Sequence, residues 1–266
     1  MKEIRMALGY RTLYVFLVGL ACWRAALGQV DPRTQGSPKA LIVTYKCLPV
    51  QRIQLRNSMT SGGLAQIENL KTTGILSGYR VLFSRYVDND NWDMMLIAFF
   101  SDGAASNGWR EVEMHLPAGL SEEALETVAS VSTTPADLVR RDAFPETRPH
   151  PVFLVVPYDY TVSAPAYARY LDGYVIPQLE GWHEGSVLSH YEIFMARYGA
   201  ARPWSALLVL QYADEAALGE RDRVSQRVRE KLSANSSWKA FADNKNAVRV
   251  EKQAVVSDEL AWPVKP

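Results

Sequence analysis

The sequence predicts an α+β fold in which one β-α-β-β-α-β unit occurs twice. Residues 76–102 and 188–214 align without a gap at an offset of 112 positions, and eight identities fall at that single offset. They include two tryptophans, Trp92 and Trp204, and four tyrosines. Each copy has two short runs rich in aromatic and β-branched residues around a polar connection, which favours a pair of strands. A duplicated hairpin of this kind indicates a duplicated fold unit.

The returning strand of each predicted hairpin is apolar on both faces. In the first copy, residues 94–99 (MMLIAF) include no polar side chain. Neighbouring side chains of a strand point to opposite faces, so such a strand must be covered on both sides. Helices of the same copy can cover one face. We expect the sheet of the other copy to cover the second, at the spacing of about 10 Å that separates packed sheets.

The first copy is predicted to span residues 40–147. We expect a strand at 40–47, a helix at 54–72, the hairpin, a loop with one short turn at 103–119, a helix at 121–131 and a closing edge strand at 136–144. Ser121 is a typical helix cap, and the two glutamates after it suit the first turn of a helix. The glycines at positions 62 and 63 weaken the front of the first helix.

The second copy is predicted to span residues 148–266, after a proline-rich junction at 145–151. Its expected elements are a strand at 152–160, a helix at 164–180, the hairpin, a helix at 214–232, a short turn at 236–241 and a last strand at 247–256. Pro177 is expected to kink or end the first of these helices, because proline lacks the backbone N–H that a helix interior needs.

The first 28 residues have the pattern of a secretory signal peptide. Basic residues at 2, 5 and 11 precede an apolar run at 13–23, and small residues stand at 26 and 28. This order of basic, apolar and small residues is typical of cleaved signals, and the run is too short to span a bilayer. We therefore predict a signal peptide at 1–28, a linker at 29–39, and a periplasmic or secreted protein. An uncleaved anchor and a lipoprotein processed at Cys22 are the alternatives.

Composition limits the partners. Removal of residues 1–28 takes away four basic side chains and one acidic one, which leaves a slightly acidic chain without a basic patch. Nucleic acid is therefore not expected as a partner. Cys47 is then the only thiol, so no internal disulfide forms, and a small buried apolar role is the expected one. We expect no stable membrane insertion after cleavage, and a monomer or weak oligomer that closes its own barrel.

The predicted topology brings certain strand ends together. In a β-α-β-β-α-β unit the ends of the first two strands and the start of the third lie at one edge of the sheet. Charged and aromatic side chains at these ends are our candidate ligand-binding residues: Lys46, Arg85, Tyr86, Tyr158, Asp159, Arg197 and Tyr198. Arginine beside aromatic side chains can bind a carboxylate or an aromatic ring. In the structural alternative, the aromatic residues pack the hairpins and each arginine pairs with Asp90 or Asp159.

Histidine is scarce, and no catalytic motif is present. The four histidines are His115, His150, His183 and His190. His183 and His190 lie near glutamates, but their spacing matches no metal site, so we predict neither a metal nor another cofactor. The sequence has no G-x-S-x-G, P-loop or H-E-x-x-H pattern.

Two stretches of the second copy carry a resemblance to known families. They are residues 174–181 (YVIPQLEG), followed by Gly185 and Leu188, and residues 235–241 (NSSWKAF). In these stretches the chain resembles NIPSNAP-like and antibiotic-biosynthesis-monooxygenase-like proteins of the dimeric α/β-barrel superfamily, whose unit is ferredoxin-like. The resemblance implies two ferredoxin-like repeats packed sheet to sheet in one chain, with a small internal cavity. That superfamily includes cofactor-free monooxygenases and haem proteins, so fold alone does not decide the activity.

Three functions follow from these observations. The first is an exported, non-catalytic small-ligand-binding or accessory protein, which we favour. The second is a cofactor-independent, monooxygenase-like enzyme that acts in the barrel cavity. The third is a structural subunit of an envelope complex. We also expect Trp92 and Trp204 to be buried equivalently, because a duplicated fold retains the aromatic residues that its core needs.

Overall fold

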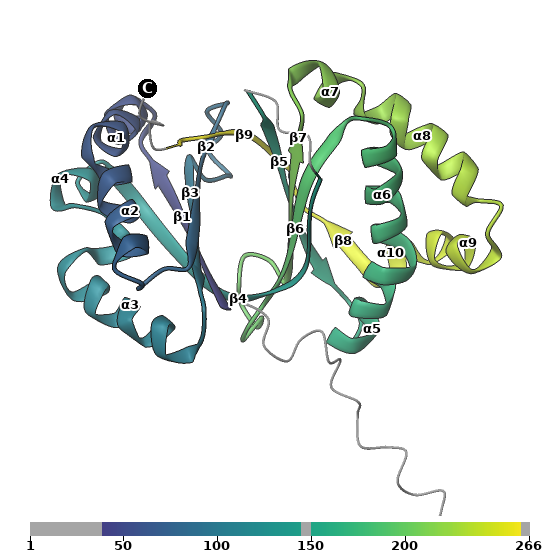
Figure 1. The fold of residues 1–266 in the computed structure, drawn as a ribbon, viewed down its shortest axis with the longest axis horizontal. Coiled ribbons are helices and arrows are strands. Elements are labelled where there is room, and N and C mark those ends of the chain that lie inside the picture. The colour runs from purple at the N-terminus through teal and green to yellow at the C-terminus, as the bar shows by residue number, and fades with distance from the viewer. Residues whose placement is uncertain (1–38, 145–149, 262–266) are drawn as a thin grey trace, which may run out of the picture. The chain divides into compact units, whose positions relative to one another are not determined.

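The computed structural model describes residues 39–144 and 150–261, shown as a ribbon in Figure 1. The predicted signal peptide, nearly all of the linker and most of the proline-rich junction lie outside the described residues. The strands of the first half are β1 (Lys39–Cys47), β2 (Gly78–Ser84), β3 (Met94–Phe100) and β4 (Val128–Ala143). Its helices are α1 (Arg52–Ser58), α2 (Leu64–Thr72), α3 (Gly103–His115) and α4 (Glu122–Leu125), with 3-10 turns at Pro49–Gln51 and Pro117–Gly119 and a π-helical turn at Met59–Gly63.

The second half has a similar set of elements. Its strands are β5 (Val152–Tyr160), β6 (Leu188–Ala196), β7 (Ala206–Tyr212), β8 (Arg249–Glu251) and β9 (Val255–Glu259). Its helices are α5 (Ala164–Tyr170), α6 (Ile176–Glu184), α7 (Glu215–Gly219), α8 (Arg221–Leu232), α9 (Ser236–Asp243) and α10 (Lys245–Val248), with a π-helical turn at Leu171–Val175.

The strands form one antiparallel sheet that closes into a ring. Neighbours follow the order β7-β6-β4-β1-β3-β2-β9-β5, and β5 pairs in turn with β7, while β8 lies beside β5 beyond β9. The first half contributes β4-β1-β3-β2 and the second contributes β9-β5-β7-β6. The halves therefore join at two seams, β4–β6 and β2–β9. Barrel closure of this kind leaves the paired strands without free edges.

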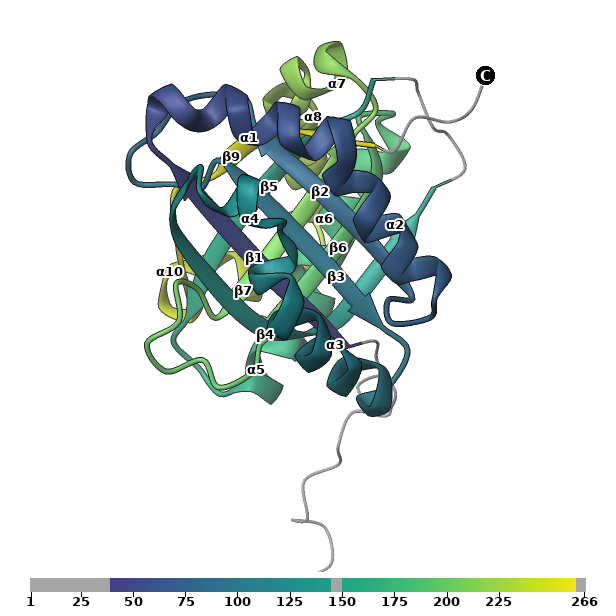
Figure 2. The same ribbon diagram turned by 90° about the vertical axis from the view of Figure 1, so that its left-hand side faces the viewer.

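Helices cover the outside of this barrel, and apolar side chains fill its inside. Figure 2 shows α1, α2 and α3 across the outer face of the first half's strands, and Figure 1 shows α6 and α8 beside those of the second half. One apolar cluster lies between helices and strands in each half, and a third lies inside the barrel. The inner cluster draws on both halves and includes Ile42, Ile97, Phe153 and Leu207. Strand β3 is buried along its whole length, as expected for a strand covered on both faces.

The first predicted helix forms, but a π-helical turn interrupts it at the weak point in the sequence. The turn ends at Gly63, which separates α1 from α2. A Cβ atom on Gly63 would lie 2.7 Å from the sulfur of Met59, a side chain that is almost fully buried. Glycine is therefore needed here for close packing as well as being a weak helix former.

The prediction of a loop at 103–119 is wrong, because α3 occupies most of this segment. Asp102 caps the helix: its carboxylate accepts a hydrogen bond from the backbone N–H of Ala105 at 2.8 Å. Trp109 and Val112 bury one face of α3 against the first half's cluster. The capping aspartate and the i, i+3 spacing were the available signals.

The predictions of a helix at 121–131 and an edge strand at 136–144 are also wrong. Ser121 caps a helix as expected, but α4 ends at Leu125 and β4 begins at Val128. Strand β4 is 16 residues long and pairs with β1 on one side and β6 on the other, so it is not an edge. The β-branched residues Val131, Thr133 and Thr134 favour this strand over a longer helix.

Three elements of the second half differ from expectation. Pro177 does not end the helix: it lies in the first turn of α6, directly after the π-helical turn, and the helix continues to Glu184. The short turn expected at 236–241 is the helix α9, capped by Asn235. The last predicted strand is split into β8 and β9 by residues 252–254. None of the helices within the described residues combines the length and apolar character that crossing a bilayer requires.

Candidate functional site

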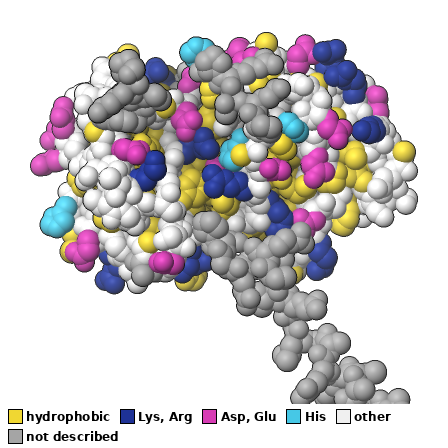
Figure 3. All heavy atoms as spheres, in the orientation of Figure 1, with side chains coloured by type: hydrophobic (Ala, Val, Ile, Leu, Met, Phe, Trp, Pro, Cys, Tyr) yellow, Lys and Arg dark blue, Asp and Glu magenta, His cyan; other side chains and the backbone are white. Residues whose placement is uncertain are grey.

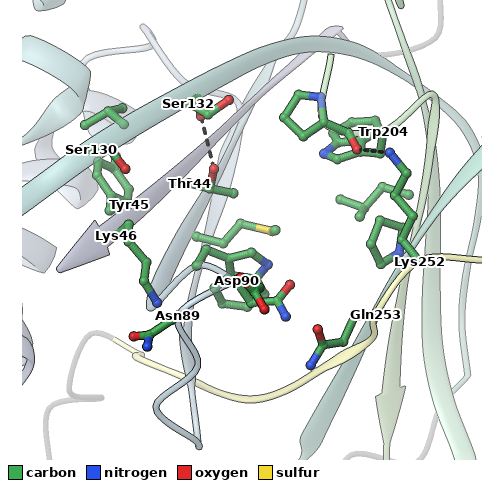
Figure 4. Close-up of a pocket in the computed structure, with 17 residues that line it drawn as sticks. Thr44, Tyr45, Lys46, Asn89, Asp90, Ser130, Ser132, Trp204, Lys252 and Gln253 are labelled. Carbon is green, nitrogen blue, oxygen red and sulfur yellow. Dashed lines mark hydrogen bonds between the residues drawn. The ribbon is translucent and has the colours of Figure 1, made fainter. Parts of the chain in front are cut away.

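A pocket of about 430 Å³ opens at the end of the barrel where the β2–β3 and β6–β7 hairpins turn. We call it the mouth pocket, and Figure 4 shows its lining. The first half supplies the ends of β1 and β4 and the β2–β3 connection; the second supplies the β6–β7 connection and the gap between β8 and β9. The lining includes three charged residues and two tryptophans: Lys46, Asp90, Lys252, Trp92 and Trp204.

Trp92 and Trp204, which hold equivalent positions in the two hairpins, both line the mouth pocket. Trp204 is buried, with 5 % of its surface exposed, and belongs to the inner apolar cluster. Trp92 is only partly buried and packs against the same cluster from the first half. The expectation of two buried tryptophans is therefore met by Trp204 alone.

Lys46 reaches the pocket from the end of β1. Its Nζ lies 3.6 Å from the carboxylate of Asp93 and donates to the backbone carbonyl of Asp88. Asp93 is itself buried: it accepts from the backbone N–H of Cys47 at 2.8 Å and pairs with Arg52 at 3.0 Å. The ammonium group of Lys46 is thus held in place at the pocket wall.

Asp159 occupies the position in β5 that Lys46 occupies in β1, and its partner lines the pocket. Its carboxylate lies 2.7 Å from Nζ of Lys252, which also donates to the carbonyl of Pro203 at 2.5 Å. Lys46 and Asp159 therefore do not pair with each other. Each half fixes one lysine at the pocket with an aspartate of its own, so the mouth pocket has two localised positive charges.

The two candidate arginines lie at the seams instead of in the pocket. Arg85, at the end of β2, pairs with Asp258 of β9 at 2.8 Å and also with Glu215. Arg197, at the end of β6, donates to Asp137 of β4 at 2.8 Å. Hydrogen bonding to these aspartates raises the pKa of both arginines. Both arginines form ion pairs, as the structural alternative predicted, but their partners are not Asp90 or Asp159.

The three candidate tyrosines also lie outside the mouth pocket. Tyr86 and Tyr198 follow the two seam arginines and are 66 % and 80 % exposed. Tyr158 is buried on the helix side of β5, where its hydroxyl donates to Glu251 at 2.9 Å and Arg249 lies over its ring. Of the seven candidates, Lys46 alone lines the pocket. Asp159 is not part of the lining, but it pairs with Lys252, which is.

Sequence reasoning missed several polar residues of the pocket. Ser130 and Ser132 line it from β4, and Lys252 and Gln253 line it from the gap between β8 and β9 (Figure 4). Ser130 was assigned to a helix that ends earlier than expected, and Ser132 to the segment between that helix and the next predicted strand. The lysine was placed inside a continuous strand. The β-branched run in β4 was the one signal that could have located the serines.

The residues around the pocket do not form a metal or nucleophile site. No cluster of three or more metal-ligating side chains occurs within residues 39–144 and 150–261. The ring of His183 stacks on Phe144 with centroids 3.6 Å apart, and His190 lies at the opposite end of the barrel beside Glu192. Burial, together with the charge of Asp93, raises the pKa of the Cys47 thiol to about 11, so thiolate chemistry is disfavoured.

Comparison with known proteins gives the fold. No protein-family model and no curated protein matches the sequence. An anthrone oxidase-like protein of known structure matches with a TM-score of 0.52 and 13% identity, over 86% of this chain and 93% of that one. Chlorite dismutase from Candidatus Nitrospira defluvii in complex with imidazole matches with a TM-score of 0.51 and 9% identity, over 86% and 93%. Both are of the dimeric α/β-barrel superfamily, and this chain shares that fold.

The mouth pocket does not suit haem, which some proteins of this fold superfamily bind. Proteins hold haem iron through an axial His, Cys, Met or Tyr side chain. The lining includes neither His nor Cys. Its Met95 is buried in the inner cluster, and the hydroxyl of its Tyr45 donates to the carbonyl of Ala118. With no available ligand atom in the lining, we derive no haem chemistry at this site.

Proposed function

We propose that the protein is a small-molecule-binding or accessory protein that takes up a partly aromatic ligand in the mouth pocket. The observation that carries the proposal is the pair of indoles, Trp92 and Trp204, that line one pocket together with two lysines. Typical ligand pockets measure roughly 300–1,000 Å³ and combine apolar walls with a few placed polar groups. The mouth pocket, at about 430 Å³, falls within that range.

A fluorescent probe tests the proposal. 1-Anilinonaphthalene-8-sulfonate combines aromatic rings with an anionic group and brightens in apolar sites. We expect saturable binding at one site, weakened by up to about tenfold in Trp92→Ala, because stacking on an indole contributes about 0.5–1.5 kcal/mol. Tyr198→Ala is the matched control, since it removes an exposed aromatic residue outside the pocket. Equal affinity in wild type and Trp92→Ala would contradict the proposal.

A cofactor-independent oxygenase in the same pocket is the second candidate. It is favoured by the fold shared with an anthrone oxidase-like protein. Such chemistry begins with loss of a substrate proton, and Asp90 is a carboxylate in the pocket lining that could accept it. Oxygen uptake with anthrone, reduced in Asp90→Asn, would favour the enzyme. Ligand binding without oxygen uptake would favour the binding protein.

We further propose that the protein is exported and acts as a monomer or weak oligomer in the periplasm or outside the cell. Support comes from the signal-like pattern of residues 1–28 and from the closed ring of strands. An intact mass that still includes Met1 would refute export, and light scattering that finds an obligate dimer would refute the monomer. Exposed Val50 and Ile53 are apolar side chains that would suit contact with an envelope partner.

We also infer that the two halves descend from one duplicated ferredoxin-like unit, and that the closer kinship is with NIPSNAP-like or antibiotic-biosynthesis-monooxygenase-like proteins. The gapless 112-residue offset and the matching strand orders support the duplication. A superposition of residues 39–144 on residues 150–261 that failed to bring Trp92 near Trp204 would contradict it.

A further inference from the structure

The wall of the mouth pocket includes a stretch of strand that has a partner on one side only. Strand β4 is an interior strand from Ala136 onward, where its pairing with β6 begins. Before that point, residues 128–135 lie beside β1 alone, with a bulge at Ala129. We call residues 130–133 the open edge. Its first three residues all line the pocket, although neighbouring side chains point to opposite faces, so the edge itself borders the pocket.

Strand register shows which backbone groups of the open edge are free. The carbonyl of Tyr45 in β1 accepts a hydrogen bond from the N–H of Asp93, so the backbone groups of Tyr45 face β3. Val131 lies opposite Tyr45, and in an antiparallel pair its N–H and C=O therefore point away from β1. The carbonyl of Thr133 points the same way and accepts from the guanidinium of Arg202 at 2.6 Å. Among the described residues, the N–H and C=O of Val131 have no such partner.

The open edge lacks the features that usually protect a free edge. Natural proteins protect such edges with charged side chains, prolines or covering segments. Residues 128–134 (VASVSTT) include neither a charge nor a proline. Charge is plentiful elsewhere: in the view of Figure 3, acidic and basic side chains are spread over both halves. Val131 is 39 % exposed, and Ser130 is exposed as well. An unprotected edge of this kind can pair with an added strand.

The occupant that fits this edge is a short extended peptide. The pocket, at about 430 Å³, has room for a few side chains but not for a folded partner that brings its own sheet. The β6–β7 connection lies over the edge at Thr133, which also keeps out a second copy of the barrel. The described chain starts and finishes at the other end of the barrel, since β1 runs toward the mouth and β9 runs away from it. The peptide is therefore expected to come from a partner protein.

A strand paired with Val131 directs alternate side chains into the pocket. The residue opposite Val131 points outward with it, and the two residues that flank it point inward, as Ser130 and Ser132 do. The inward side chains meet the indole of Trp204 and the side chain of Met95. In Figure 4, Trp204 lies across the pocket from Ser130. The two inward positions therefore favour apolar or aromatic side chains.

We propose that the open edge binds an extended peptide segment of a partner protein. The segment pairs antiparallel to β4 through the N–H and C=O of Val131, and it places two apolar or aromatic side chains, two residues apart, in the mouth pocket. This inference rests on the function proposed for the mouth pocket and names the class of its ligand. Backbone hydrogen bonds contribute affinity, and the pocket selects the side chains.

Calorimetric titration of the whole protein with two synthetic peptides tests the pairing. The probe is acetyl-Thr-Phe-Val-Phe-Thr-amide, in which two phenylalanines flank a central valine. The control has the same sequence with a methyl group on the backbone nitrogen of that valine, so it keeps every side chain but loses the N–H donor. We expect one saturable site for the probe. We expect the control to bind at least about tenfold more weakly, because a hydrogen bond is lost and the methyl group keeps the strands apart.

Val131→Pro is the matched variant of the protein. It removes the free N–H without removing a bond to β1, and proline is tolerated where the N–H of an edge strand faces outward. Affinity for the probe peptide should fall at least about tenfold, whereas Val131→Thr should bind it as the wild type does. The dye 1-anilinonaphthalene-8-sulfonate should bind to both variants, because it needs the pocket and not the backbone of the edge.

The dye separates this inference from the function proposed above. Equal affinity of the two peptides, or no peptide binding by a wild-type protein that binds the dye, would overturn the peptide site and leave a pocket for small molecules. If neither the dye nor the peptide binds, both proposals fail. If Val131→Pro does not fold, the comparison of the two peptides on the wild type decides.

Discussion

The two ends of the barrel have opposite chemistry although they are built on the same strands. Strands β2 and β6 start at the end of the barrel opposite the mouth pocket, which we call the ionic end, and finish at the mouth pocket. Toward the ionic end the buried carboxylate of Glu192, in the middle of β6, lies 3.5 Å from Arg80 of β2. At the far ends of both strands Arg85 and Arg197 form ion pairs across the seams, and indoles line the opening. Between the ends the interior is apolar. The surroundings of an inward side chain therefore depend more on its position along the strand than on which strand carries it.

The largest effect is expected at the ionic end. Glu192→Ala removes the carboxylate that Arg80, Arg141 and His190 share, and it leaves buried positive charge without its partner. We expect a loss of about 3–5 kcal/mol in the free energy of unfolding, as is usual when one partner of a buried pair is removed. Urea unfolding measures it. A loss below about 1 kcal/mol would mean that the charges at this end are solvated.

The buried carboxylate of Glu192 also makes the stability of the fold depend on pH. Burial alone would raise the pKa of Glu192, but contact with His190 and the charges of Arg80 and Arg141 lower it below its ordinary value. A lowered pKa in the folded state stabilises the protein above the unfolded value of about 4.3, and this contribution is lost as pH falls through the folded pKa. The free energy of unfolding of the wild type should therefore fall below about pH 4, and it should fall more steeply than that of Glu192→Gln. Parallel pH profiles would contradict the assignment.

The mouth pocket should be less sensitive to truncation. Trp204→Ala removes a buried indole, but one side of that indole already faces the pocket, so water can enter the space left behind. We expect a loss of about 3 kcal/mol, at the low end for buried tryptophan, and about 1 kcal/mol for the partly buried Trp92. Thermal or urea unfolding of both variants checks the order. Equal losses would indicate that the two halves bury their tryptophans alike.

The smallest effect is expected at the seams. Arg85→Ala and Arg197→Ala each remove an ion pair across a seam, but both side chains are partly exposed to solvent. Pairs of this kind contribute about 0.2–1 kcal/mol. Stability should fall by no more than that, and binding of the fluorescent probe should not change. A tenfold loss of probe binding would instead indicate that both arginines take part in ligand binding.

The sequence predicted the strands far better than the segments between them. Dense apolar runs located the hairpins, β1 and β5. A few neighbouring residues are enough to give this signal, so it does not depend on distant partners. The error at residues 103–143 has a physical cause: Ser121 and its glutamates do start a helix, but pairing with β1 and β6 draws the chain into a strand after Leu125. Tertiary pairing of this kind overrides local preference.

The candidate site was predicted in part, and for an identifiable reason. Topology alone placed Lys46, Trp92 and Trp204 at one end of the sheet, and all three line the mouth pocket. Topology could not show that Arg85 and Arg197 turn to Asp258 and Asp137, because those partners come from the other half of the chain. The buried role of Glu192 depends in the same way on Arg80 and Arg141, which are distant in sequence.

Strand β4 has a consequence for how the chain folds. Its residues pair with β1 in its own half and with β6 in the other, so the backbone hydrogen bonds of both halves share one strand. Loss of either half would expose β4 and the inner cluster together. The described chain should therefore unfold in one cooperative step, with amide protons of β1 and β6 exchanging at the same global free energy. Two halves that share a strand in this way behave as a single folding unit, and neither half is expected to persist without the other.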